Sequence, residues 1–338
     1  MSHPLSPPLP LISRADRDAA RRLVESCDLR FLENFDDLMG IFEDGRLVGC
    51  GARAGRVLEM LVVSPEHRGG GLVGEIVGEL MRRGCEAGCT GFFIFTRPCT
   101  APTFARLGFK PLVEHEKAVL LEHGNGLLGY LRGRAALARS GSNGAVVINA
   151  DPFSLGHQYL VECAAARTDT VYVLVPNEGR FVLPLADRLE LARRGTAHIP
   201  NAVVTDAGPY VLGPATFPAY FLKPGDQPDQ VALEIDADLF GRHIAPFLNI
   251  TTRIVGTEPL DPATRSYNQA LFRRLSKWGL RLVEIERKKI GDRWINTAHV
   301  HNALARSDWR EVEAFVPPST LAFLNTLKPG SAQWRAAA

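Results

Sequence analysis

The chain has 338 residues, of which 46% are apolar and 22% charged, a composition typical of a globular protein long enough for two domains. Its 39 basic and 37 acidic residues give a formal net charge of +2, which indicates neither a basic field for nucleic acid nor an acidic, disordered chain. The proline-rich start lacks the pattern of a secretory signal, and no run approaches the roughly 20 apolar residues of a membrane helix. We expect a cytoplasmic protein whose partners include no nucleic acid and no membrane.

Six cysteines are scattered along the chain, without the paired spacing of a zinc site or the density of a disulfide framework. We expect reduced thiols. Cys85 and Cys89 are four residues apart on a predicted helix and Cys99 follows a predicted strand, so the alternatives are a metal cluster and small buried helix residues. Four suitable ligands do not converge in the sequence, and we expect no metal site built by the protein itself.

Strands and helices alternate in the first 122 residues. Asp44 and Gly45 supply a two-residue turn between apolar runs, which predicts a hairpin. Apolar residues recur every three to four positions after residue 71, which predicts a helix with one buried face. In order, we predict a hairpin, a strand, a helix, a strand and a short helix, over residues 41–53, 56–63, 67–85, 91–97 and 101–109.

A run of three glycines at 69–71 precedes the apolar part of the long helix, where backbone N–H groups can approach an anion. The order strand, Arg68-x-x-Gly71, helix, strand and FARLGF resembles the GNAT-type acetyltransferases, whose Arg-x-x-Gly-x-Gly/Ala loop holds the pyrophosphate of acetyl-CoA. Val73 stands at the last small position of that loop, and Gly74 follows. The resemblance implies a GNAT-like fold for residues 1–122; without a ligand, the glycines would only give the helix a flexible start. The candidate contacts of a CoA-like group are Arg68, Gly69, Gly71 and Gly74.

Residues 123–143, rich in glycine, arginine and alanine, are predicted to form a linker helix and loop. In residues 144–338 strands alternate with helices, which indicates a parallel sheet and an α/β domain of Rossmann-like type. The predicted strands span residues 145–149, 170–176, 202–205, 253–259 and 279–287, and the predicted helices include 157–167 and 184–195.

The first strand of this part, AVVIN, runs into Asp-Pro-Phe and then Ser154-Leu-Gly156-His157 at a helix start. In parallel sheets ligands bind at the carboxyl ends of strands, where a helix start offers free N–H donors. His157 can direct an imidazole N–H toward a phosphate oxygen, Gly156 permits close approach, and Ser154 either caps the helix or donates to the same phosphate. The alternative is a purely structural histidine.

This series resembles the nucleotidyltransferase superfamily marked by His-x-Gly-His or Thr-x-Gly-His after the first strand. The resemblance implies attack on the α-phosphate of a nucleotide and release of pyrophosphate, with electrostatic stabilisation of the phosphates. The superfamily's second mark, Ile-Ser-x-Ser/Thr-x-x-Arg, corresponds here to INTAHVH at 295–301, which places Ala298 at the hydroxyl position and His301 at the arginine position. Arginine is permanently charged, whereas histidine is mostly neutral near pH 7. Either the site is weakened, or another side chain compensates, the candidates being His299, Arg293, Lys288 and Lys289.

Longer stretches, among them NADPFSLGHQYLVECAA, LPLADRLELARRGT, ATFPAYFLK and LVEIERK, are similar to the citrate lyase ligase family, most specifically over residues 144–330. The resemblance implies an ATP-dependent ligase that activates acetate as acetyl-AMP, releases pyrophosphate and acetylates the prosthetic-group thiol of the citrate lyase acyl carrier subunit. ATP is then a substrate, Mg²⁺ bridges its phosphates, and the first domain recognises the CoA-like arm of the carrier. The alternatives are an acetyl-CoA-dependent acetyltransferase and a catalytically weakened nucleotide-binding or carrier-binding module.

Three side chains are catalytic candidates: His157, Ser154 and Lys223, the last with an exposed surface lysine as the alternative. Arg188 either faces the site or pairs with Asp187 or Glu190 on its own helix. Three aromatic residues, Tyr220, Phe221 and Tyr267, either wall an adenine site or fill the core. The expected nucleotide-binding residues are Asn149, Asp151, Pro152, Phe153, Gly156, Arg188, Gly256, Thr257, Glu258, Ile295, Asn296, Thr297 and His301.

Overall fold

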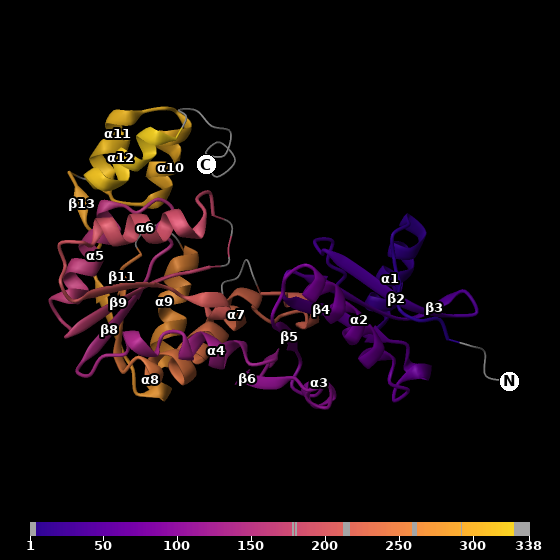
Figure 1. Ribbon diagram of the computed structural model, residues 1–338. Helices are drawn as coiled ribbons and strands as arrows, with labels where there is room; N and C mark the ends of the chain where they lie inside the picture. Colours follow the sequence, from indigo (N-terminus) through magenta and orange to yellow (C-terminus); the bar gives the residue numbers. More distant parts are fainter. Residues whose placement is uncertain are drawn as a thin grey trace. The chain divides into compact units, whose positions relative to one another are not determined.

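The computed structural model describes residues 5–177, 179, 181–211, 217–258, 262–291 and 293–327, without the side chains of 262–264 and 267. The chain forms two compact units, each with a large sheet of its own (Figure 1). The first unit comprises Met1–Gly129 together with Phe217–Val231, and the second comprises Tyr130–Thr216 together with Ala232–Ala338. These units differ from the expected domains in two places, because residues 217–231 belong to the first unit and the linker expected over 123–143 is divided between the units after Gly129.

The first unit is built on a seven-stranded mixed sheet in the order β1-β2-β3-β4-β5-β7-β6. Only β4 and β5 pair in parallel within it; the other neighbours are antiparallel. The expected hairpin, strands and helices all form, in the expected order. The strands are β1 Leu9–Pro10, β2 Asp37–Glu43, β3 Arg46–Ala54, β4 Val57–Val63, β5 Phe92–Thr96, β6 Lys110–Glu114 and β7 Val119–His123, and the helices are α1 Arg14–Ser26, α2 Leu72–Glu86 and α3 Ala101–Ala105.

Helix α2 buries the apolar face that its sequence period predicts. Leu72, Ile76, Val77 and Leu80 are at most 3% exposed and pack with Ile94 of β5 in one core cluster. Apolar burial of this kind is the main force that holds a helix on a sheet. The start of α2 is therefore held firmly at one end of the sheet.

The segment Phe217–Val231 joins the first unit because its aromatic residues bury their rings there. Phe217 packs edge-to-face on Phe95, with ring centroids 5.2 Å apart, and Tyr220 is 4% exposed. Arg97 adds a polar anchor, since its Nε donates to the carbonyl oxygen of Phe221 at 2.6 Å. The buried aromatic rings therefore hold this segment in the first unit, although the sequence pattern predicted it to be part of the second domain.

The second unit contains a five-stranded, all-parallel sheet in the order β10-β9-β8-β11-β12. Its first strand, β8, lies between β9 and β11, so the strand order reverses at the carboxyl ends of β8 and β11. Ligands of open α/β sheets bind at such a switch point. The strands are β8 Asn143–Val147, β9 Thr170–Val175, β10 Ala202–Asp206, β11 Ile250–Gly256 and β12 Arg281–Ile285, and a separate two-stranded ribbon is formed by β13 Lys289–Ile290 and β14 Arg293–Trp294.

Helices pack around this sheet, and the last three gather beside α6 (Figure 1). Val161 of α5, Leu191 of α6 and Val300 of α10 belong to the same apolar core as Val146 and Val173 of the central strands. The helices are α4 Gly126–Arg132, which begins in the first unit, α5 Leu155–Ala165, α6 Leu185–Gly195, α7 Pro228–Leu239, α8 Ala245–Phe247, α9 Pro262–Leu275, α10 Thr297–Ala305, α11 Trp309–Phe315 and α12 Pro318–Thr326. Within the described ranges, none of the helices is long and apolar enough to span a bilayer.

The first and last predicted strands of this unit are shifted relative to the sequence patterns. Strand β8 ends at Val147 rather than at Asn149, and β12 ends at Ile285 rather than at residue 287. Pairing with the neighbouring parallel strands stops at these points, so the residues that follow leave the sheet as loops. The loops after β8, β11 and β12 consequently emerge at one edge of the sheet.

Candidate functional site

Ser154 and His157 interlock at the start of α5. The Ser154 hydroxyl caps the helix by accepting the backbone N–H of His157 at 3.3 Å, and Nδ1 of His157 accepts the backbone N–H of Ser154 at 3.1 Å. This is a capping box in which histidine takes the place usually held by glutamate or glutamine. Ser154 is only 3% exposed, so its hydroxyl serves the helix start and the orientation of His157.

His157 is a neutral hydrogen-bond donor in this arrangement. Since Nδ1 accepts a hydrogen bond, the ring proton lies on Nε2. Burial, and secondly the positive charge of Arg287, lower the pKa of His157 to about 4. The imidazole therefore stays neutral at physiological pH.

Asp151 holds the neighbouring loop together through its carboxylate. Its two carboxylate oxygens accept the backbone N–H groups of Val182 and Leu183, each at 2.8 Å, and the residue is 4% exposed. Pro152 and Phe153 are buried beside it, with Phe153 fully buried. The loop after β8 is thus a rigid support for α5.

Arg188 is buried against the loop after β8. It makes no pair with Asp187 or Glu190 among the described contacts; its Nη1 donates to the carbonyl oxygen of Asn149 at 3.0 Å. Its guanidinium lies over Phe181, 3.8 Å from the ring centroid, and the residue is 1% exposed. Arg188 is a structural tie between α6 and the loop after β8.

The second motif meets the first at Gly156. A Cβ atom at Gly156 would lie 3.2 Å from Cγ2 of Ile295, so the absence of a side chain allows the two segments to touch. Asn296 caps α10 by accepting the backbone N–H of Ala298 at 2.9 Å, and Thr297 is the first residue of that helix. Two helix starts, of α5 and α10, therefore lie close together, each with a positive dipole end.

His301 ties α10 to the loop after β8. Its Nε2 donates to the backbone carbonyl oxygen of Asp151. The position where the superfamily resemblance places an arginine is thus occupied by a side chain that is engaged in the protein itself. Ala298, at the hydroxyl position, is exposed.

The four side chains that could replace the missing arginine are also engaged elsewhere. Arg293 pairs with Glu311, Lys288 lies over the ring of Tyr159 and Lys289 lies over that of Trp294. His299 stacks near Phe315, with ring centroids 5.9 Å apart. Arg293 and His299 thus contact α11, Lys288 contacts α5 and Lys289 stays within the ribbon, while Nδ1 of His299 is buried without a hydrogen-bond partner among the described residues.

Arg287 is a further cation near His157, and its charge lowers the pKa of that imidazole, but the sequence patterns did not single it out. It follows β12, and its Nε donates to the carbonyl oxygen of Thr257 at 2.8 Å while its guanidinium pairs with the buried carboxylate of Glu258. Its backbone N–H donates to Oγ1 of Thr257 at 3.2 Å, and its stem lies over Gly256. Gly256, Thr257 and Glu258, three of the expected nucleotide-binding residues, therefore all contact Arg287. Arg287 is part of the stretch LVEIERK, but its closeness to His157 results from the tertiary structure and could not be predicted from that stretch.

Lys223 and the aromatic residues near it lie in the first unit, whereas His157 lies in the second. The Lys223 side chain is exposed, as in the surface alternative, and its backbone N–H donates to Asp226 at 2.9 Å. Tyr220 and Phe221 are buried in the first unit. The side chain of Tyr267 lies outside the described residues.

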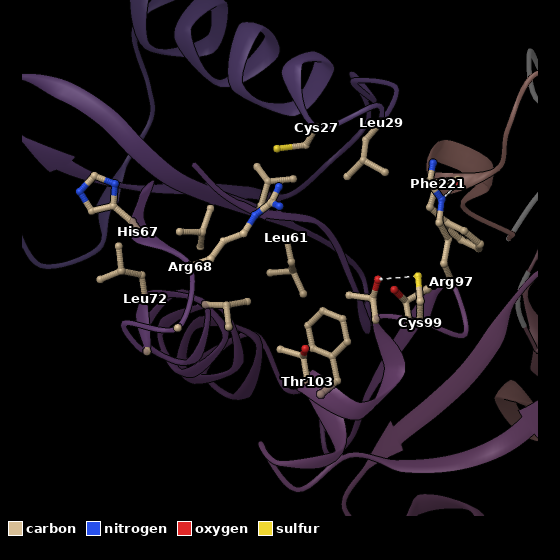
Figure 2. Close-up of a pocket in the computed structure, with 18 of the residues that line it drawn as sticks. Cys27, Leu29, Leu61, His67, Arg68, Leu72, Arg97, Cys99, Thr103 and Phe221 are labelled. Atoms are coloured by element: carbon tan, nitrogen blue, oxygen red, sulfur yellow. Dashed lines mark hydrogen bonds between the residues drawn. The ribbon is translucent and has the colours of Figure 1, made fainter. Parts of the chain in front are cut away.

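The glycine loop before α2 lines a pocket of about 470 Å³ in the first unit. Figure 2 shows Arg68 and Arg97 on opposite sides of this pocket, with Cys27 above and Phe221 beside Arg97. Gly69 and Gly71 have positive φ angles of 88° and 84°, which glycine adopts without strain. Of the four expected contacts, Arg68, Gly69 and Gly71 line the pocket, whereas Gly74 packs toward Leu107.

Acidic, histidine and cysteine side chains are not grouped in threes anywhere in the described ranges in a way that could hold a metal ion. Asp151 and Glu258, the carboxylates of the site, are both engaged within the protein.

A parallel sheet with a capped histidine helix at its switch point defines the second unit as an open, doubly wound α/β domain. The family model described as the citrate lyase ligase C-terminal domain matches residues 143–324. Citrate (pro-3S)-lyase ligase of Klebsiella pneumoniae is 38% identical over 289 residues, which span 83% of this chain and 84% of that protein. The enzyme of the same name from Escherichia coli is 31% identical over 341 residues, or 97% of each chain. The chain belongs to the citrate lyase ligase family.

Solved structures with partial similarity include Thermotoga maritima TmcAL bound with alpha-thio ATP, with 16% identity, a TM-score of 0.36 and coverage of 55% of each chain. FeeM, an N-acyl amino acid synthase from uncultured soil microbes, has 12% identity and a TM-score of 0.31, and covers 35% of this chain and 89% of its own.

Proposed function

We propose that this chain activates acetate with ATP and transfers the acetyl group to the prosthetic-group thiol of the citrate lyase acyl carrier subunit, which switches citrate lyase on. Family membership supports the ligase activity. The observation that carries the chemistry is the neutral imidazole of His157 at the start of α5, whose Nδ1 accepts the backbone N–H of Ser154, beside a second helix start. Neutral donors and helix dipoles of this kind stabilise phosphate charge without a proton transfer.

The proposed reaction has two steps. In the first, an acetate oxygen attacks the α-phosphorus of ATP, the bond to the bridging oxygen breaks, and pyrophosphate leaves. In the second, the thiol sulfur attacks the acetyl carbon, the carbon–oxygen bond to AMP breaks, and the thiol proton is released. Mg²⁺ would supply charge neutralisation on the triphosphate. His157 needs only to donate and hold a hydrogen bond throughout.

Exchange of labelled pyrophosphate into ATP tests the first step. We expect exchange that depends on acetate, that is weaker with propionate, and that is absent without an acid. His157→Ala should lower kcat about 10²-fold, since it removes a donor to the developing charge. His198→Ala is the matched control, because His198 is 51% exposed and pairs with Glu162 in the same unit. Absence of acetate-dependent exchange in the purified protein with Mg²⁺ would disprove the proposal.

The first unit, in this proposal, recognises the CoA-like arm of the carrier. Its pocket offers Arg68, Arg97 and the glycine loop to a phosphate group. Arg68→Ala should raise KM for the carrier subunit and leave pyrophosphate exchange unchanged. Arg22→Ala, an exposed arginine of α1 outside the pocket, should change neither quantity. An unaltered affinity for the carrier in Arg68→Ala would contradict this role.

A second candidate function is supported by the same pocket. Its volume and its arginines also suit acetyl-CoA, as in an acetyl-CoA-dependent acetyltransferase. Calorimetry with acetyl-CoA, followed by an assay for free thiol, separates the two proposals. A protein that exchanges pyrophosphate but neither binds nor consumes acetyl-CoA excludes the acetyltransferase. A protein that binds ATP without turnover would instead be a nucleotide-binding or carrier-binding module.

A further inference from the structure

Transfer at the α-phosphorus requires fixed positive charge near the triphosphate, because negative charge spreads over the transferred group and the leaving pyrophosphate. The superfamily's arginine position is occupied by His301, whose Nε2 donates to the carbonyl oxygen of Asp151. A histidine in that bond can supply neither the permanent charge nor the two-pronged geometry of an arginine. If the site is active, another residue must therefore provide the permanent charge and the two-pronged geometry.

Arg287 is held in one orientation at the carboxyl edge of the sheet. Its Nε donates to the carbonyl oxygen of Thr257 at 2.8 Å, and Nη2 bonds to the carboxylate of Glu258. The Glu258 side chain is 2% exposed, whereas that of Arg287 is 25% exposed. The structure records no partner for Nη1 of Arg287 among the described residues. This side chain is thus anchored on one side and accessible on the other.

The backbone beside Arg287 lies next to the histidine motif. The N–H of Ile295 donates to the carbonyl oxygen of Lys288 at 3.1 Å, and Ile295 packs on Gly156, the residue before His157. The charge of Arg287 also lowers the pKa of His157, as expected for a cation near an imidazole. The loops after β8 and β12 therefore bring Arg287 and His157 to one place.

We propose that Arg287 contacts the phosphates of ATP as the permanent cation of this site, and that Glu258 is the residue that positions it. The assignment rests on the proposed adenylation of acetate, since it names the group that stabilises the same transition state. It differs from the expectation drawn from the sequence, which looked for a substitute among Arg293, Lys288, Lys289 and His299. Arg287, which follows β12, thus takes the role that the motif's own arginine has in the superfamily.

The test compares three variants in acetate-dependent pyrophosphate exchange. Arg287→Gln should lower kcat/KM for ATP at least about 10²-fold, and Arg287→Lys should recover only part of it, since lysine keeps the charge without the fork. Arg293→Gln is the matched control, because Arg293 is 56% exposed and paired with Glu311, and it should stay within about threefold of wild type. Glu258→Gln should raise KM for ATP more than it lowers kcat.

A second measurement does not depend on turnover. NMR titration of the free protein should give a higher pKa for His157 in Arg287→Gln than in wild type, whereas Arg293→Gln should leave that pKa where it was. If wild type exchanges pyrophosphate and Arg287→Gln retains wild-type kinetics, the assignment of Arg287 is wrong and the proposed function stands. If wild type shows no exchange, the proposed function and this assignment both fall. Should Arg287→Gln fail to fold, Arg287→Lys decides: unchanged kcat/KM for ATP overturns the assignment, and at least a tenfold loss supports it.

Discussion

Gly156 packs directly against Ile295, and this contact joins the two motifs that lie about 140 residues apart in the chain. A Cβ at position 156 would lie 3.2 Å from Cγ2 and 3.4 Å from the carbonyl oxygen of Ile295. The first distance is tighter than an ordinary van der Waals contact, and the second is at the lower limit of one. The relative placement of the starts of α5 and α10 thus depends on a missing methyl group.

Gly156→Ala is expected to destabilise the protein by about 1 to 2 kcal/mol, because the crowding cost exceeds the gain in helix propensity. Urea unfolding measures this change. Gly78→Ala in α2 is the matched control: nothing lies within 4 Å of the Cβ that alanine would add there, and the substitution should stabilise by about 0.5 to 1 kcal/mol. Equal effects of the two substitutions would show that the contact with Ile295 does not restrict position 156.

His157 makes stability depend on pH in one direction. Its pKa falls from 6.5 in the unfolded chain to about 4 in the folded protein, so the folded state disfavours protonation. Above about pH 6.5 the residue has no effect on the pH dependence. As pH falls from 6.5 toward 4, only the unfolded chain takes up this proton, and the folded state loses stability. Denaturant titrations between pH 7 and pH 4 should show a loss in wild type that His157→Gln lacks; parallel curves would contradict the burial of a neutral imidazole.

His301 donates a structural hydrogen bond, so the loss of stability on its replacement should depend on whether the new side chain can donate one. His301→Ala removes the bond to the Asp151 carbonyl and should cost about 1 to 2 kcal/mol in the free energy of unfolding. His301→Gln keeps an N–H donor and should retain more of that stability. If pyrophosphate exchange collapses in the glutamine variant although its stability is preserved, His301 has a role beyond this structural one.

Arg97 fastens the segment Phe217–Val231 to the first unit. Its Nε donates to the carbonyl oxygen of Phe221 at 2.6 Å and its Nη2 to that of Asp28 at 3.0 Å. Arg97→Ala should lower the free energy of unfolding by about 1.5 to 3 kcal/mol, the range for hydrogen bonds from charged groups. Thermal unfolding checks this value, with the exposed Arg22→Ala as reference. A loss no larger than that of the reference would mean that aromatic burial alone holds the segment.

Local patterns were sufficient for most of the secondary structure and for the first motif. The period of Leu72, Ile76 and Leu80 predicted the buried face of α2, and strand alternation with helices predicted the parallel sheet of the second unit. Helix-start chemistry placed His157 correctly at the first turn of α5. These features depend on residues that are neighbours in sequence, which is why sequence alone determined them.

Long-range packing decided the rest. Burial of Phe217 and Tyr220 moved their segment from the second unit into the first, and it separated Lys223 from the unit that holds His157. His301, at the position where the superfamily resemblance places an arginine, bonds to the carbonyl oxygen of Asp151, while Arg287, after another strand, bonds to Thr257 and Glu258. Which cation faces a ligand depends on how parallel strand ends are brought together in three dimensions, and no local spacing encodes that arrangement.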